Sequence, residues 1–228
     1  MKNLVNIEKY REGSYEVSLD GLKRSCPLYK VEKDIWIVGN EHLSFGTDIE
    51  FTHKVGALLA EKLGRYEFDI LMTVETKSLC IAYEVARNLG NKEFAVARKS
   101  IKPYTENHIS VNISSITSAK NETLYLDNLN IDRIRNKKII LLDDVVSTGS
   151  TMRGLLELAK DAMAEVSVIA TVWLEGPWPF EQFTEELESE RLVFLDILPV
   201  FASGKAYEQL YKRKTIIETR EKYNKYRQ

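Results

Sequence analysis

The chain has 228 residues, of which 44% are hydrophobic, and carries a formal net charge of −2 at pH 7. A chain of this length can hold one large domain, or one domain with appendages, around a real hydrophobic core. The small net charge excludes a global field that would attract nucleic acid or a membrane surface. The isolated thiols Cys26 and Cys80 form neither a disulfide framework nor a paired metal-ligand motif, which indicates a reducing compartment.

No stretch of the sequence has the length and apolar character of a transmembrane helix. The segment from Met1 to Tyr10 is mixed polar and lacks the apolar centre of a signal peptide. We therefore expect a cytoplasmic protein that does not enter a membrane.

Residues 1–46 are predicted to form short strands that together make a small cap or flap. The segments Pro27–Val31 and Ile35–Val38 have the composition of strands. Lys33 and Asp34 lie between them, as in the turn of a β-hairpin. We treat residues 1–46 as an N-terminal hood.

Residues 47–202 are predicted to form an α/β core. A helix is expected from Asp48 to Gly64, because apolar residues recur there on one helical face. Strands are expected at 69–74 and 93–97, with a helix at 77–89 between them. This β-α-β order of buried strands predicts a central parallel sheet that is flanked by helices and has right-handed crossovers.

The pattern changes between Lys99 and Asn130. Residues 108–116 and 123–127 alternate like two antiparallel strands and are joined by a polar connection. We interpret residues 103–127 as a β-hairpin inserted into the core. Long insertions of this kind in compact domains often serve as lids.

The last part of the chain is predicted to contain strands at 166–173 and 192–200, with a charged helix at 180–190 between them. Residues 203–228 are predicted to form a basic C-terminal helix. A solvated helix or one that packs in an oligomer explains its charge, and nucleic-acid binding is the alternative. We expect no nucleic-acid partner.

The stretch from Ile139 to Thr151 carries the most specific chemistry. Its four apolar residues are typical of a strand covered on both faces, and Asp143 and Asp144 follow at the strand's carboxyl end. Buried carboxylates persist where they meet donors or cations. The loop that follows is rich in Ser, Thr and Gly and opens a helix, so its free N–H groups and the helix dipole predict an anion site.

Two further segments leave neighbouring strands with positive charge. The first is Val74-Glu75-Thr76-Lys77-Ser78, which opens a helix, and the second runs from Val96 to Pro103 and contains three cations. In open parallel sheets, ligands bind beyond the carboxyl ends of the strands. The two segments and the loop therefore predict a site for a ligand with several phosphate groups.

The stretch from Ile139 to Thr151 resembles the 5-phosphoribosyl 1-diphosphate (PRPP) motif of the type I phosphoribosyltransferases. The order of segments between Asp69 and Val200, with Ala97-Arg98-Lys99-Ser100-Ile101-Lys102-Pro103 ahead of the hairpin, is similar to that of the adenine phosphoribosyltransferase branch. This resemblance implies an enzyme that transfers the phosphoribosyl group of PRPP to a purine base, with adenine preferred. It also implies magnesium, a hood over the base, a lid and a homodimer.

The resemblance also implies roles for individual residues. Asp143 and Asp144 would act in catalysis and contact magnesium indirectly, through water or PRPP. Residues of the loop would bind the 5-phosphate: Val146, Ser147, Thr148, Gly149, Ser150 and Thr151. Residues of the two positive segments would bind the diphosphate: Thr76, Lys77, Ser78, Arg98, Lys99 and Lys102.

Two features depart from the family pattern. The diphosphate loop has Lys77 and Ser78 where the family usually has Arg and Gly, so charge is kept but the bidentate fork is lost. The lid stretch 115–120 lacks the acidic residue that is a proposed acid/base group in adenine enzymes. Glu106 and Glu122 are the nearest carboxylates, and we assign the catalytic role to Glu106.

The identity of the base is open at this stage. Tyr29 and Trp36 in the hood are candidates to stack on it, with plain core packing as the alternative for both. A xanthine or hypoxanthine–guanine phosphoribosyltransferase would use the same scaffold. A purine-responsive transcriptional regulator that binds PRPP without catalysis is the alternative outside the enzyme class, although residues 1–46 are predicted as strands and not as a helix-turn-helix.

Overall fold

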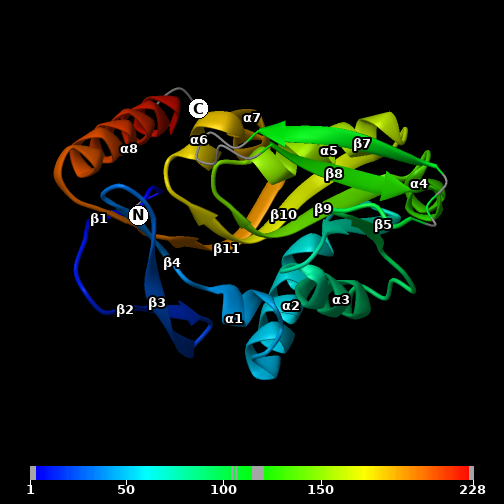
Figure 1. Cartoon of the computed structure of the whole chain (residues 1–228), viewed down its shortest axis with the longest axis horizontal. Coiled ribbons are helices and arrows are strands. Elements are labelled where there is room, and N and C mark those ends of the chain that lie inside the picture. Colours follow the sequence, from blue (N-terminus) through cyan, green and yellow to red (C-terminus); the bar gives the residue numbers. More distant parts are fainter. Residues whose placement is uncertain (1–3, 104, 106, 115–120, 226–228) are drawn as a thin grey trace.

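The computed structural model describes residues 4–103, 105, 107–114 and 121–225 (Figure 1). They form two five-stranded sheets and a two-stranded hairpin, with helices packed around them. The central parallel sheet flanked by helices confirms the predicted fold class. The N-terminal strands form the hood, and the hairpin lies beside the core.

The core sheet has the strand order β11-β10-β9-β5-β6, and every neighbouring pair is parallel. It contains the following strands: β5 (Ile70–Val74), β6 (Ala95–Ala97), β9 (Lys138–Val146), β10 (Glu165–Glu175) and β11 (Leu192–Leu198). This order puts β9 at the centre, so the Asp pair at its end lies in the middle of the sheet's carboxyl edge.

Helices cover both faces of the core sheet, as Figure 1 shows. Helices α2 (Ile49–Leu63) and α3 (Leu79–Asn88) pack on one face, while α4 (Asn128–Ile134) and α5 (Ser150–Asp161) lie on the other. Successive residues of a strand point to opposite faces. For this reason the run Ile139–Leu142 is apolar throughout and supplies both hydrophobic clusters.

Helix α2 begins and ends where its sequence predicts. The Asp48 carboxylate accepts a hydrogen bond of 3.0 Å from the Phe51 N–H, which satisfies one free donor of the first turn. Gly64 is the residue at which the helix ends. The Arg24 guanidinium also pairs with the Asp48 carboxylate, so this helix start is tied to the hood.

The stem of the inserted hairpin is part of the hydrophobic core. Strands β7 (His108–Ser114) and β8 (Asn121–Asp127) pair antiparallel, as predicted, and pack on α5. Ile113 and Leu124 are buried and sit against Gly154 of α5, where a Cβ atom would come within 2.5 Å of the Ile113 side chain. The lid tip at 115–120 lies outside the described residues.

The hood is a second sheet with the order β1-β12-β4-β3-β2. Its strands are β1 (Ile7–Lys9), β2 (Ser14–Leu19), β3 (Leu22–Glu32), β4 (Ile35–Val38) and β12 (Val200–Ala202). The predicted hairpin of β3 and β4 is present. Strand β12 comes from the other end of the chain and pairs parallel with β1, which ties the hood to the end of the core.

The remaining helices differ in length. Helix α1 (Glu41–Ser44) is a single turn at the end of residues 1–46, and α8 (Gly204–Lys225), with 22 residues, packs on β1 and β12. The charged helix expected at 180–190 is instead two short helices, α6 (Trp178–Gln182) and α7 (Thr184–Glu188). Phe183 separates them because its buried side chain turns into the core.

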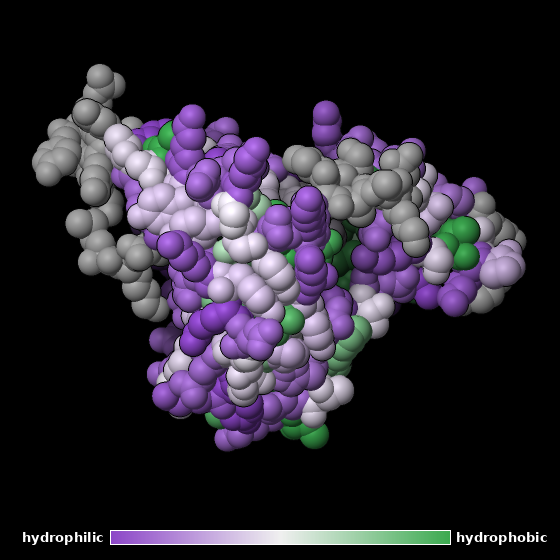
Figure 2. Space-filling view, turned by 60° about the vertical axis from the view of Figure 1, so that its left-hand side comes forward, coloured by the Kyte–Doolittle hydropathy of each residue, from purple (hydrophilic) through white to green (hydrophobic). Residues whose placement is uncertain are grey.

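The face of the molecule shown in Figure 2 is mostly hydrophilic. Hydrophilic side chains dominate this face, and apolar side chains are exposed at scattered points. Within the part of the chain that the structure describes, the helices lack the combination of length and apolar character that crossing a bilayer requires.

The close approach of the hairpin to α5 yields a stability prediction. Gly154→Val should destabilise the protein by about 1–3 kcal/mol, because the added methyl groups overpack the contact with Ile113 and Leu124. Urea unfolding checks this. Gly64→Ala is the control, since a Cβ there meets its nearest atom at 3.5 Å, and it should leave stability unchanged or raise it by up to about 1 kcal/mol. Equal stabilities for both variants would contradict the packing of the hairpin stem.

Candidate active site

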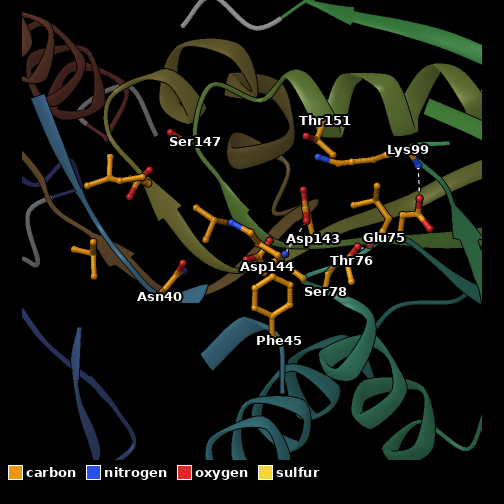
Figure 3. A pocket seen from close by; sticks show the side chains of 16 residues that line it. Asn40, Phe45, Glu75, Thr76, Ser78, Lys99, Asp143, Asp144, Ser147 and Thr151 are labelled. Carbon is orange, nitrogen blue, oxygen red and sulfur yellow. Dashed lines mark hydrogen bonds between the residues drawn. The ribbon is translucent and has the colours of Figure 1, made fainter. Parts of the chain in front are cut away.

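A cavity of about 420 Å³ lies at the carboxyl edge of the core sheet, beneath the end of the hood (Figure 3). The Asp pair, the start of the hydroxyl-rich loop, the first positive segment and the end of β4 all contribute to its walls. The described lining residues are Ile37, Val38, Asn40, Phe45, Val74, Glu75, Thr76, Lys77, Ser78, Lys99, Asp143, Asp144, Val145, Ser147, Thr151 and Glu175. The structure thus brings three of the predicted segments to one space.

The carboxylates of Asp143 and Asp144 are both buried, with 7% of each residue exposed. The backbone N–H of Asp144 donates a hydrogen bond of 2.9 Å to the Asp143 carboxylate. Burial, and then the charge of Asp144, raise the pKa of Asp143 well above its usual range, and Lys99 partly offsets this. Such a pair favours a ligand that supplies hydroxyl donors or a cation.

The loop after β9 encloses a separate small cavity of about 100 Å³, which all six predicted 5-phosphate residues line. Gly149 has φ of +75°, a conformation that glycine adopts without strain, and a Cβ atom there would lie 2.7 Å from the Phe183 ring. The hydroxyls of Thr148 and Ser150 are 2.9 Å apart at the start of α5. This loop therefore has the geometry of an anion cradle at a helix N-terminus.

The predicted diphosphate residues are only partly brought together. Thr76, Lys77, Ser78 and Lys99 line the cavity. The Ser78 hydroxyl is buried and donates to the Val74 carbonyl at 2.8 Å, so it holds the loop in place and is not free for a ligand. The peptide bond between Glu75 and Thr76 is cis.

Arg98 and Lys102 are not among the described lining residues. The Arg98 backbone pairs with Tyr125 of β8, and its Nε lies 3.6 Å from the Glu75 carboxylate. Arg98 therefore joins the core to the hairpin stem, while the backbone N–H of Lys99 donates to the Glu75 carboxylate at 2.8 Å and holds it at the edge of the site. The roles of Arg98 and Lys102 in diphosphate binding remain predictions.

The two lysines of the cavity wall have carboxylate partners. Lys77 Nζ lies 2.5 Å from Glu41 of α1, and Lys99 Nζ lies 3.1 Å from Glu122 of β8. All four side chains are roughly half exposed, so a phosphate ligand can replace these partners at small cost. The cations are thereby held at the rim where a diphosphate would leave.

The predicted base contacts lie outside the described lining of this cavity, which departs from expectation. Trp36 stacks on Tyr10, with ring centroids 3.7 Å apart, and so packs within the hood. Tyr29 lies against Gly39, where a Cβ atom would come within 2.5 Å of its ring. The hood side of the cavity is formed by Ile37, Val38, Asn40 and Phe45. Glu106, the predicted lid carboxylate, lies outside the described residues.

Glu175, at the end of β10, is a site residue that the sequence did not reveal. It lines the cavity with only 4% of its surface exposed. Burial raises its pKa to about 7, and the negative charge of Asp144 adds to this, while a hydrogen bond with the Ser147 side chain and the charge of Lys77 oppose it. The one available signal was an acid placed directly before the Gly176-Pro177 break.

Comparisons with known proteins found relatives of this chain in sequence and in structure. The phosphoribosyl transferase domain model matches residues 48–179, more than half of the chain. The purine biosynthesis transcriptional repressor PurR of Bacillus subtilis (strain 168) is 30% identical over 60% of this chain and 46% of its own length. The xanthine phosphoribosyltransferase of Clostridium tetani (strain Massachusetts / E88) is 27% identical over 63% of this chain and 78% of its own.

The structure of the adenine phosphoribosyltransferase from Thermoanaerobacter pseudethanolicus is similar in fold, with a TM-score of 0.58. It is 18% identical, and the match covers 71% of this chain and 88% of that one. The chain belongs to the phosphoribosyl transferase domain family, which confirms the resemblance. The chain spans only 46–63% of the length of the PurR regulators that it matches.

The raised pKa of Glu175 predicts a pH-dependent stability. Its ordinary pKa is 4.5 and its folded value about 7, so the folded protein binds this proton more tightly than the unfolded chain. The stabilising effect of that proton is complete below pH 4.5 and is lost as the pH rises to about 7. Glu175→Gln should therefore raise the free energy of unfolding at pH 8 by about 1–3 kcal/mol and change it little at pH 5.

Urea unfolding of Glu175→Gln at the two pH values measures this difference. Glu157→Gln on the exposed side of α5 is the control and should show no such pH dependence. The same gain at both pH values in Glu175→Gln would mean that ionisation of Glu175 is not its cause.

Proposed function

We propose that this protein is a purine phosphoribosyltransferase, which transfers the phosphoribosyl group of PRPP to a purine base and releases diphosphate. One observation carries the proposal. The buried pair Asp143 and Asp144 directly precedes a phosphate-sized cradle at the start of α5, and the pair shares its cavity with Lys77 and Lys99. This places groups for a sugar, a 5-phosphate and a diphosphate side by side.

The reaction replaces the bond between ribose C1 and diphosphate with a bond from C1 to a nitrogen of the base. Positive charge develops on the ribose as the old bond breaks. Asp143 and Asp144 hold the ribose hydroxyls and stabilise that charge at short range. Residues Val146–Thr151 hold the 5-phosphate, so the sugar is fixed at both ends.

The departing diphosphate gathers negative charge, which Lys77 and Lys99 at the cavity wall neutralise. Thr76 contributes to the same wall. Arg98 and Lys102 are proposed, on the sequence resemblance, to add positive charge for the diphosphate. When diphosphate leaves, Glu41 and Glu122 are placed to pair with the two lysines again.

Magnesium fits the residues present. No group of three or more His, Cys, Asp or Glu side chains with metal-site geometry occurs within the described parts of the chain. Asp143 and Asp144 supply oxygen donors and carry a charge repulsion that a cation would relieve. Magnesium bound through water and substrate oxygens would neutralise charge on the diphosphate.

The base is proposed to be a purine that enters beneath the hood. Adenine follows from the sequence resemblance, and the adenine phosphoribosyltransferase of Thermosipho africanus (strain TCF52B), 31% identical over 51% of this chain, supports it. The xanthine phosphoribosyltransferases among the relatives support the alternative of an oxopurine. A lid that excludes water, an acid/base role for Glu106, a homodimer and a cytoplasmic location are proposed on the resemblance alone.

A second function is favoured by a specific observation. PurR regulators match 60–76% of this chain, and the lid stretch 115–120 contains no acidic residue. A protein that binds PRPP and regulates transcription without catalysis would keep the phosphate cradle and the Asp pair. It would bind PRPP in calorimetry but would release no diphosphate from it.

Asp144→Asn tests the catalytic role of the Asp pair. The variant should lower kcat by at least about 100-fold, because one of the two charges that stabilise the transition state is lost. Its melting temperature should not fall, since the charge of Asp144 adds to the cost of ionising the buried Asp143 and the substitution removes that contribution. Steady-state kinetics and thermal unfolding measure the two effects. A kcat close to that of the wild type would remove Asp144 from the catalytic residues.

Lys99→Ala tests whether Lys99 binds the diphosphate. We expect PRPP and diphosphate to bind about 10- to 100-fold more weakly, because a charge-assisted hydrogen bond to phosphate is lost. Lys92→Ala, at an exposed position outside the cavity lining, is the matched control and should leave both affinities unchanged. Calorimetry with each ligand and magnesium measures the change. Equal affinities for Lys99→Ala and the wild type would place the diphosphate elsewhere.

A further inference from the structure

Asn40 is a buried polar residue whose side-chain nitrogen has no hydrogen-bond partner among the described residues. It lies between β4 and α1, lines the large cavity and has only 6% of its surface exposed. Its Nδ2 atom is buried and finds no hydrogen-bond partner among the described residues. Buried side-chain amides are nearly always paired, so an unpaired one at a cavity wall indicates that a ligand supplies the partner.

The usual structural role of such a residue does not apply here. An asparagine ahead of a helix commonly caps it through its side chain. Asn40 precedes α1 and makes no side-chain cap hydrogen bond. The backbone of Asn40 makes the hydrogen bonds to α1 instead, since its carbonyl accepts from the N–H groups of Leu43 at 2.9 Å and Ser44 at 3.1 Å. The side chain of Asn40 therefore has no capping role in α1.

The backbone around Asn40 is held by hydrogen bonds, which fixes the point from which its side chain extends. The Gly39 N–H donates to the Pro27 carbonyl at 2.7 Å, and the Asn40 N–H donates to the Val38 carbonyl at 3.0 Å. Tyr29 packs so closely on Gly39 that a Cβ atom there would clash with its ring. Tyr29 thus supports the turn that presents Asn40, although it does not line the cavity itself.

The surroundings of Asn40 suit a flat heterocycle. In Figure 3 the Asn40 side chain and the Phe45 ring lie on the hood side of the cavity, and Asp144 lies on the core side. Ile37 and Val38 add apolar surface on the same wall. An apolar wall with a single amide at its edge can bury the face of a ring while it pairs with one polar group on the ring's rim.

We propose that Asn40 reads the hydrogen-bonding edge of the base and is a specificity-determining residue of the site. This inference rests on the proposed function. The chemistry recognised is an acceptor on the rim of a purine, which is either the carbonyl oxygen of a 6-oxopurine or a ring nitrogen of adenine. Nδ2 donates to that acceptor, and the amide oxygen can accept from a neighbouring N–H of the same base.

The test compares ligands that differ only in the base. Ribose 5-phosphate, AMP, IMP, GMP and XMP share the sugar phosphate, and calorimetry measures their affinities without a need for turnover. Asn40→Leu keeps the branched shape and the number of heavy atoms of the side chain and removes the amide. The nucleotide that the wild type prefers should bind about 10- to 100-fold more weakly to this variant. Ribose 5-phosphate should bind equally well to both proteins.

Two further variants keep the test decisive. Asn91→Leu is the matched control, since Asn91 also has a buried amide atom without a described partner but does not line the cavity. It should change no nucleotide affinity. Asn40→Ala makes a smaller change and replaces Asn40→Leu if thermal unfolding shows that the leucine variant has lost its fold.

The possible results separate this inference from the proposed function. A selective loss for AMP supports the inference and assigns adenine, while a selective loss for IMP, GMP or XMP supports it and assigns an oxopurine. An unchanged preference in both Asn40 variants overturns the inference and leaves the transferase site intact. Wild-type protein that binds neither ribose 5-phosphate nor PRPP would overturn the proposed function itself.

Discussion

The burial of two carboxylates at the end of the central strand is the constraint on which the rest of the site depends. Asp143 and Asp144 lie near the carboxyl end of a strand that is covered on both faces, so neither has bulk water to stabilise its charge. The raised pKa of Asp143 expresses that cost in the free protein. In the proposed function, a polyhydroxyl sugar with a magnesium ion would remove that cost, and the loop that follows in sequence would fix the position of the ligand.

The hood and the hairpin bring further groups to this centre from distant parts of the chain. The hood contributes an apolar wall and the Asn40 amide, and it is tied to the core by the pairing of β1 with β12. The hairpin stem packs on α5 and contributes Glu122 as the partner of Lys99. In the proposed function, base recognition therefore depends on the hood, while the groups for the sugar phosphate and the diphosphate lie at the carboxyl edge of the core sheet.

The core and the phosphate site were predictable because their signals are local. An apolar run, two acids and a hydroxyl-rich turn stand in one continuous stretch around β9, and strand and helix periods alternate before it. The base side was not predictable in the same way. The aromatic character of Tyr29 and Trp36 does not tell which face of the hood they occupy. In the sequence, Glu175 is an ordinary acid before a turn, and only the pairing of β10 with β9 brings it to the site. The pairing of β12 with β1 joins segments that are too distant in the chain for a local pattern to predict.

The most direct test of the central claim is the release of diphosphate from PRPP by the wild-type protein with magnesium and a panel of bases. The panel consists of adenine, hypoxanthine, guanine and xanthine, with orotate and uracil as pyrimidine comparisons. A phosphoribosyltransferase with this site should release diphosphate when one of the purines is present and should be inactive with both pyrimidines. Binding of PRPP in calorimetry without release of diphosphate for any base would contradict transferase activity and establish a regulatory, ligand-binding role for the same site.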